Sequence, residues 1–295
     1  MVWLERLNHM PSQPLLATLG ETYSVLLERF GSCSPFELAI LGGRAMPTPG
    51  LAFLLGYQAA LRVLWPSAPQ SLGALCASER RSVRPADMQT RLDELRLSGS
   101  KDFVTAGLDA DWLLVAARSE AEGESPRLSL AVVYPGEPGI RLEPLPALPL
   151  MPEVGHARLH LEQALCERLA GDGWDAYVKP FRTLEDLYVL SALCAWLYGV
   201  GRVSRWPQSL QLRLISLLAG CAEGSRLCAD TGACHLLLGG LFAQFAGSRE
   251  EINRALLASD GQWASLWQRD QGVLDIASAA RSKRLAKACA AAGLS

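Results

Sequence analysis

Residues 95–118, LRLSGSKDFVTAGLDADWLLVAAR, contain the pattern that decides the fold. The opening Leu-Arg-Leu-Ser alternates apolar and polar residues, which predicts a strand with one buried face. Residues 98–100 (Ser-Gly-Ser) then predict a turn, and residues 103–105 resume an extended segment. Residues 112–117 form an uninterrupted apolar run, which is typical of a strand covered on both faces. We therefore expect this stretch to lie in a β-domain.

The chain divides into three parts around this stretch, and together they predict an α+β fold. Residues 1–72 carry helical periodicity, including a pattern over residues 14–30, and predict an N-terminal helical domain. Residues 73–162 contain short alternating segments separated by prolines, as expected of a small barrel-like β-domain. Residues 163–295 return to apolar positions at helical spacing, which predicts a C-terminal helical bundle.

The composition excludes several broad classes of protein. Of the 295 residues, 49% are hydrophobic and 20% charged, which is typical of a globular protein. A formal net charge of −2 gives no general electrostatic reason to bind nucleic acid or an anionic membrane. The start of the chain shows no signal-peptide pattern, and the apolar runs are too short to span a membrane. We expect a soluble, cytoplasmic protein whose eight cysteines are mostly buried, reduced thiols.

The histidines and cysteines predict no metal site. His156 and His160 are four residues apart, but on a strand this spacing keeps them too far apart to share a metal easily. Cys228, Cys234 and His235 are close in sequence. Their spacing suits no usual zinc site, so we expect them in the core.

The central stretch resembles the middle β-domain of the acyl-CoA dehydrogenases. In that family, a strand ending in Leu-x-Gly-x-Lys is followed by an aromatic-x-Thr segment, then by Ala-Asp and an apolar strand. Here these elements stand at residues 97–101, 103–105 and 110–115. The resemblance implies the family's three-part fold, with a shortened N-terminal domain. It also implies that Phe103 and Thr105 lie against a flavin ring.

The resemblance extends to the loop that would hold FAD. Ser78 and Glu79 match a Thr-Glu element of the family, which implies that they contact the edge of the flavin. The family's Gly-Ser-Asp element does not follow, and residues 80–85 read Arg-Arg-Ser-Val-Arg-Pro. A glycine that lets a backbone approach a ligand cannot be freely exchanged for arginine, so the FAD site is altered. These residues are either a solvated basic loop or a source of cations for phosphates.

Glu185 is the candidate catalytic residue. Thr183 and Asp186 have the spacing of a capping box, which predicts that a helix begins there with Glu185 in its first turn. In the isovaleryl-CoA type of the family, the catalytic glutamate lies on this helix. The resemblance therefore implies that Glu185 abstracts the α-proton of an acyl thioester. Alternatively, an acidic residue in a first turn simply stabilises the helix dipole. No Tyr-Glu follows Gly239-Gly240, where most members of the family carry the base.

The leading functional interpretation is an acyl-CoA dehydrogenase-like flavoprotein that oxidises an acyl thioester, such as an acyl-CoA, at Cα–Cβ with FAD. The family usually assembles through its C-terminal bundle, so the resemblance implies a homodimer or tetramer. A second hypothesis is a catalytically inactive relative that serves as a binding or scaffold subunit. A third keeps FAD but uses it with oxygen or as an electron carrier.

Overall fold

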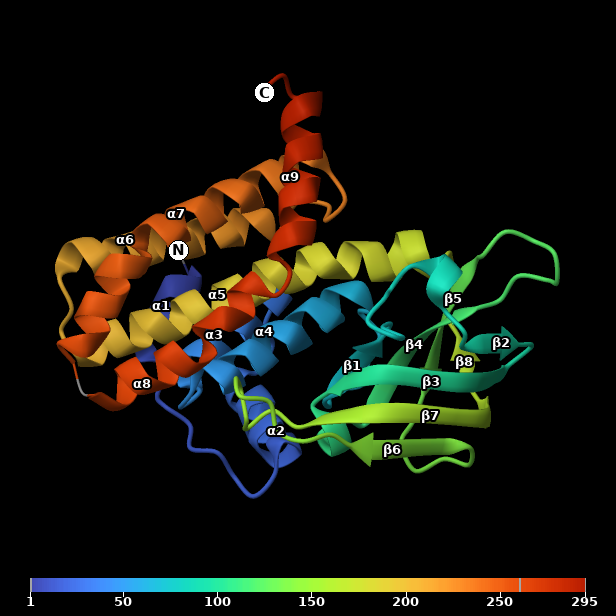
Figure 1. Ribbon diagram of the computed structural model, residues 1–295. Helices are drawn as coiled ribbons and strands as arrows, with labels where there is room; N and C mark the ends of the chain where they lie inside the picture. The colour runs from blue at the N-terminus through green and yellow to red at the C-terminus, as the bar shows by residue number, and fades with distance from the viewer. Residues whose placement is uncertain (1, 260, 295) are drawn as a thin grey trace.

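The N-terminal part is helical. The computed structural model describes residues 2–259 and 261–294 (Figure 1). Its first helices are α1 (Val2–His9), α2 (Leu19–Phe30), α3 (Pro35–Ala45) and α4 (Pro49–Leu64). The predicted helix over residues 14–30 begins only at Leu19, because Thr18 and Glu21 form a capping box that starts α2.

The middle part is a curled, mixed sheet, which confirms the α+β class. Its strands are β1 (Gly73–Cys76), β2 (Arg91–Asp93), β3 (Arg96–Thr105), β4 (Trp112–Arg118), β5 (Leu128–Val133), β6 (Ile140–Pro144), β7 (His156–Leu165) and β8 (Glu167–Arg168). They are ordered β6-β7-β3-β2-β4-β5-β8, with β1 paired in parallel to β4. Strand β7 runs across the predicted boundary at residue 162, and the sheet ends with β8.

Strand β3 continues through the residues where the sequence pattern predicts a turn. Its pairing with β7 shifts register between Leu97 and Gly99, where the extra residue lies on β7, and β3 itself stays extended instead of turning. Gly99 has a φ of 140°, and a Cβ at this position would lie 2.6 Å from the Cα of Thr90. The predicted turn is therefore wrong, because β3 continues through Gly99, where the glycine permits a close approach to Thr90.

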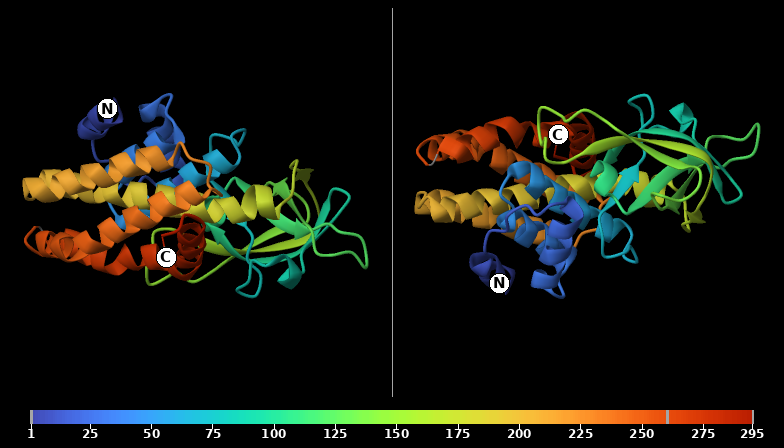
Figure 2. Two further views of the ribbon diagram at one scale, coloured as in Figure 1. Left: turned by 90° about the horizontal axis from the view of Figure 1, so that it is seen from above. Right: turned by 90° about the horizontal axis from the view of Figure 1, so that it is seen from below.

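The C-terminal part is a bundle built around one long helix. Its elements are the π-helical turn η3 (Trp174–Val178), α5 (Lys179–Val203), α6 (Gln208–Gly224), α7 (Gly232–Leu257), α8 (Gly261–Asp270), the 3-10 turn η4 (Gln271–Asp275) and α9 (Ser278–Ala291). Figure 2 shows α5 between the N-terminal helices on one side and α8 and α9 on the other. Among the described helices, none combines the length and apolar character needed to cross a membrane.

Helix α5 begins four residues before its predicted start. Lys179 is its first residue, so Thr183 is buried in the helix interior and does not act as a cap. The predicted capping box is therefore wrong. The Asp186 carboxylate instead pairs with Arg281 (2.7 Å) and Arg284 (2.6 Å), which lie on α9. These ion pairs attach α9 to α5.

One buried carboxylate connects the three parts of the chain. Asp270, at the end of α8, is 0% exposed and accepts hydrogen bonds from the backbone N–H of Gly50 (3.1 Å) and of Met151 (2.8 Å). Arg269 pairs with the same carboxylate (2.7 Å) and with Glu153 (2.6 Å). Gly50 lies on α4, and Met151 lies between β6 and β7. Asp270 therefore fixes the N-terminal helices and the sheet against the bundle.

We expect Asp270→Ala to lower the free energy of unfolding by about 3–5 kcal/mol, because it leaves two buried amides without an acceptor and removes one of the two carboxylates that pair with Arg269. Urea denaturation measures the change. Asp275→Ala is the control, since the Asp275 side chain is 57% exposed and its ion pair with Arg249 is 3.4 Å long. The control should cost less than about 1 kcal/mol. Equal losses in the two variants would contradict this role for Asp270.

Candidate active site

A tight turn follows β1 at the position of the predicted flavin loop. Glu79 and Ser82 exchange two backbone hydrogen bonds of 2.8 Å. The two residues between them, Arg80 and Arg81, have φ angles of 48° and 63°. Two successive left-handed residues usually call for glycine or asparagine, so this turn is strained for arginine. Strained backbone persists only where the surrounding structure holds it in place.

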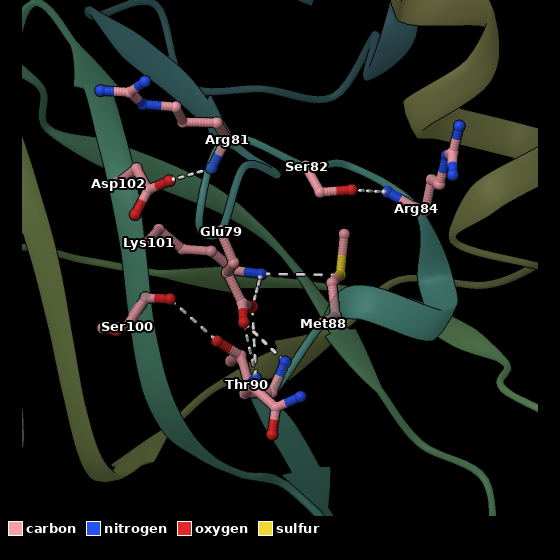
Figure 3. A network of polar contacts seen from close by, with 10 residues as sticks. Glu79, Arg81, Ser82, Arg84, Met88, Thr90, Ser100, Lys101 and Asp102 are labelled. Carbon is pink, nitrogen blue, oxygen red and sulfur yellow. Dashed lines mark hydrogen bonds and ion pairs between the residues drawn. The ribbon is translucent and has the colours of Figure 1, made fainter.

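Asp102 of β3 holds this turn (Figure 3). Its Oδ2 accepts a hydrogen bond from the backbone N–H of Arg81 (2.9 Å), and its own N–H donates to the Ser78 carbonyl (2.9 Å). The side chains of Arg80 and Arg81 are exposed, and neither forms an ion pair with any residue that the structure describes. Both guanidinium groups therefore remain available to an anion.

The Glu79 carboxylate points inward from the turn. It pairs with the Lys101 ammonium at 2.6 Å and accepts hydrogen bonds from the N–H groups of Gln89 (2.6 Å) and Thr90 (3.2 Å) (Figure 3). Lys101 is 0% exposed. Burial raises the pKa of Glu79, but Lys101 and these hydrogen bonds outweigh it, so the pKa lies below its ordinary value. The Glu79 carboxylate is therefore held inside the fold, and the Glu79 backbone is held in the turn with Ser82.

Phe103 and Thr105 lie at the end of β3. The Phe103 side chain is 42% exposed, and its ring packs edge-on against His156 of β7 at a centroid distance of 5.6 Å. Burial lowers the pKa of His156, which favours the neutral imidazole. Thr105 is half-buried. The end of β3 therefore presents one exposed aromatic ring beside an imidazole whose neutral form is favoured.

Tyr57 of α4 connects this end of the sheet to α5. Its hydroxyl oxygen accepts a hydrogen bond from the Leu75 N–H (2.8 Å). Burial raises the pKa of Tyr57, the nearby Glu185 carboxyl raises it further, and a side-chain hydrogen bond with Thr105 lowers it. Tyr57 therefore adjoins Thr105 and lies within electrostatic range of Glu185.

Glu185 faces a small, mostly apolar cavity of about 80 Å³. Its walls include Phe53 of α4, Val189 of α5 and Leu274 of η4. Burial raises the pKa of Glu185 to about 7, with Asp186 raising it and Arg182 lowering it. The carboxylate forms no hydrogen bond or ion pair with the residues described by the structure. This is the environment that a general base requires: one unpaired carboxyl in an apolar slot, with its pKa near neutrality.

The neighbouring acid, Asp186, has a different environment from Glu185. Burial raises its pKa as well, but Arg281 and Arg284 oppose that effect and occupy both carboxylate oxygens. Its oxygens therefore hold α9 in place, whereas those of Glu185 have no such structural role.

The structure brings most of the predicted site residues together. Ser78, Phe103 and Thr105 lie along one end of β3 and the adjoining turn, and Tyr57, beside Thr105, lies within electrostatic range of Glu185. The sequence patterns do not predict the ion pair of the buried Lys101 with Glu79, nor the hydrogen bond between Tyr57 and Leu75. The sequence does indicate that Lys101 is buried, because residues 97 and 101 lie on the same face of a strand and Leu97 is apolar.

Lys101→Met should lower the free energy of unfolding by about 3–5 kcal/mol, because it leaves the Glu79 carboxylate buried without a cation. The double variant Lys101→Met/Glu79→Gln should recover much of this loss, since it removes both charges. Thermal and urea denaturation measure the effect.

The matched control for this prediction is Lys179→Met, which breaks an exposed pair with Asp175 (3.1 Å). This control should change stability by less than about 1 kcal/mol. If the double variant were as unstable as Lys101→Met alone, the buried charge would not be the cause.

No protein-family model and no curated protein sequence matches this chain. Solved structures do match it. A structure of FkbI, described as acting in biosynthesis of the methoxymalonyl extender unit of the Fk520 polyketide, has 18% identity and a TM-score of 0.64, over 98% of each chain. An FAD-dependent dehydrogenase has 15% identity and a TM-score of 0.70, over 100% of this chain and 97% of the other.

Butyryl-CoA dehydrogenase from Megasphaera elsdenii has 12% identity and a TM-score of 0.61, over 96% of this chain and 92% of the other. The three matches span nearly the whole chain, from the N-terminal helices through the sheet to the bundle. This chain therefore has the fold of the acyl-CoA dehydrogenase-like flavoproteins.

Proposed function

We propose that this chain is a flavoprotein that oxidises an acyl thioester at the Cα–Cβ bond, with FAD as cofactor and Glu185 as the base. The observation that carries the proposal is the unpaired Glu185 carboxyl at an apolar cavity, with its pKa raised to about 7. Two proteins with this fold are an FAD-dependent dehydrogenase and a butyryl-CoA dehydrogenase, which is consistent with this chemistry.

The residues near the end of β3 fit a flavin. Phe103 and Thr105 would lie against the ring, and the turn that begins at Ser78 and Glu79 would lie at its edge. The unpaired guanidinium groups of Arg80 and Arg81 suit the pyrophosphate, in place of a glycine-rich loop. FAD, when bound, supplies the acceptor for a hydride from Cβ.

Glu185 would take the proton from Cα. Deprotonated at mildly alkaline pH, it has no intramolecular partner to compete for the proton. The apolar walls around the half-buried Glu185 side chain reduce its contact with water and strengthen its interaction with the thioester. Tyr57, between Thr105 and Glu185, would keep the base and the flavin face at a fixed separation.

A non-catalytic relative is the second candidate. The observation that favours it is the closed turn at Arg80 and Arg81, whose backbone is held by Asp102 and by the Glu79–Ser82 hydrogen bonds. Such a turn would block the backbone approach that a glycine permits. In that case, the chain would bind a partner without oxidising a thioester.

The proposal includes a cytoplasmic homodimer or tetramer that assembles through the bundle. All eight cysteines are free thiols, which suits a reducing compartment. On α6, Leu212 is 53% exposed and offers apolar surface for such contacts.

An absorbance spectrum of the purified protein, before and after addition of FAD, separates the two candidates. The proposed flavoprotein should show flavin bands near one FAD per chain. A spectrum without flavin bands, unchanged by added FAD, would favour the non-catalytic relative.

Glu185→Gln should retain FAD but lower the rate of dye reduction by roughly 100-fold or more, because the amide cannot accept the proton. The activity of the unmodified chain should rise with pH through about 7, as the carboxyl loses its proton. Glu223→Gln, an exposed acid on α6, is the control and should leave the rate unchanged. Full activity in Glu185→Gln would refute its assignment as the base.

Replacement of Glu185 also affects stability. A carboxyl whose pKa is higher in the folded state destabilises the fold as pH rises from its unfolded pKa of about 4.3 toward 7. Glu185→Gln should therefore be more stable than the unmodified chain above pH 7, whereas the two should converge in acid. Denaturation at several pH values measures this difference, and parallel curves would contradict the raised pKa.

A further inference from the structure

The cavity in front of Glu185 is too small for a long chain. Its volume is about 80 Å³, whereas sites for drug-sized ligands measure about 300–1,000 Å³. Phe53, Val189 and Leu274 line it. A group placed against the Glu185 carboxyl therefore has room for only a few heavy atoms before it meets these side chains.

The packing of α4 against α5 prevents this space from continuing between the helices. Gly56 of α4 faces the backbone of α5, and a Cβ on Gly56 would lie 2.6 Å from the Tyr188 carbonyl oxygen and 2.8 Å from the Val189 Cα. Helices this close leave no channel between them. The cavity consequently ends at its wall on α4.

Aromatic rings fill the remaining space beside this wall. Phe53 and Tyr57 lie one turn apart on α4 with ring centroids 6.0 Å apart. The ring of Phe181 on α5 packs edge-on against Tyr57 at 5.5 Å. All three rings are buried. Of the three, Phe53 lines the cavity.

We propose that Phe53 sets the length of the acyl group, and that the chain accepts short acyl thioesters and excludes long ones. This inference rests on the proposed function, since it names the substrate class of the same site. The Phe53 ring lines the same cavity as Glu185 and is its wall on α4. Removing the ring would join the cavity to the volume that the ring vacates.

Binding of unreactive analogues tests the inference apart from catalysis. S-butyl and S-octyl coenzyme A are thioethers, so they lack the carbonyl group that makes the Cα proton acidic, and they are not oxidised. Calorimetry measures their affinity for the purified protein supplied with FAD. The unmodified chain should bind the S-butyl analogue at least roughly tenfold more tightly than the S-octyl analogue. In Phe53→Ala, the S-octyl affinity should rise by at least roughly tenfold while the S-butyl affinity changes little.

Phe36→Ala is the matched control. Phe36 is 6% exposed, as against 8% for Phe53, but it packs against Trp3 and does not line the cavity. It should keep the preference for the short analogue. Phe53→Leu, a milder truncation that disturbs the core less, should shift the preference in the same direction as Phe53→Ala.

The possible results are distinguishable. Equal or tighter binding of the S-octyl analogue by the unmodified chain would overturn the length limit and leave the proposed function standing. An unchanged preference in both Phe53 variants would overturn the role of Phe53. If neither analogue bound, the proposed acyl-thioester function would fail, and the inference would fail with it.

Discussion

The buried Asp270 carboxylate is the constraint on which the candidate site depends. It holds the start of α4 through Gly50, and the chain between β6 and β7 through Met151. Phe53 lies one turn further along α4, and η4 follows Asp270 directly. Both supply walls of the cavity in front of Glu185. The hydrogen bonds of Asp270 therefore determine the positions of two walls of this cavity, although Asp270, Gly50 and Met151 do not line it.

Glu185 and Asp186 show how environment assigns different roles to adjacent acids. Asp186 lies where two arginines of α9 can reach it, so its charge is used to attach one helix to another. Glu185 points toward apolar walls and has no partner among the described residues, so its charge is costly and its pKa rises. Burial of the charged carboxylate is unfavourable for stability. The same burial raises the pKa of Glu185, so that it can accept a proton near neutral pH.

The sequence patterns predict those features of the structure that depend on residues close together in the chain. The strand at residues 112–117, the helices of the bundle and the positions of Phe103 and Thr105 follow from periodicity and from the family resemblance. The Glu79 side chain points inward because it pairs with Lys101, which is 22 residues away in the sequence. The hydrogen bond between Asp270 and Gly50 spans 220 residues. No local pattern reports such contacts. The misplaced start of α5 has a similar reason, since the segment over residues 174–182 becomes helical through packing against the sheet rather than through a cap.

The protonation of Glu185 in the folded protein is the most direct test of this account. Infrared difference spectra of the unmodified chain and Glu185→Gln, recorded across a pH titration, isolate the carbonyl band of this one carboxylic acid. The account predicts that the band disappears with a midpoint near pH 7. A midpoint near the ordinary glutamate value of about 4.3 would show a solvated surface acid and contradict the proposed base.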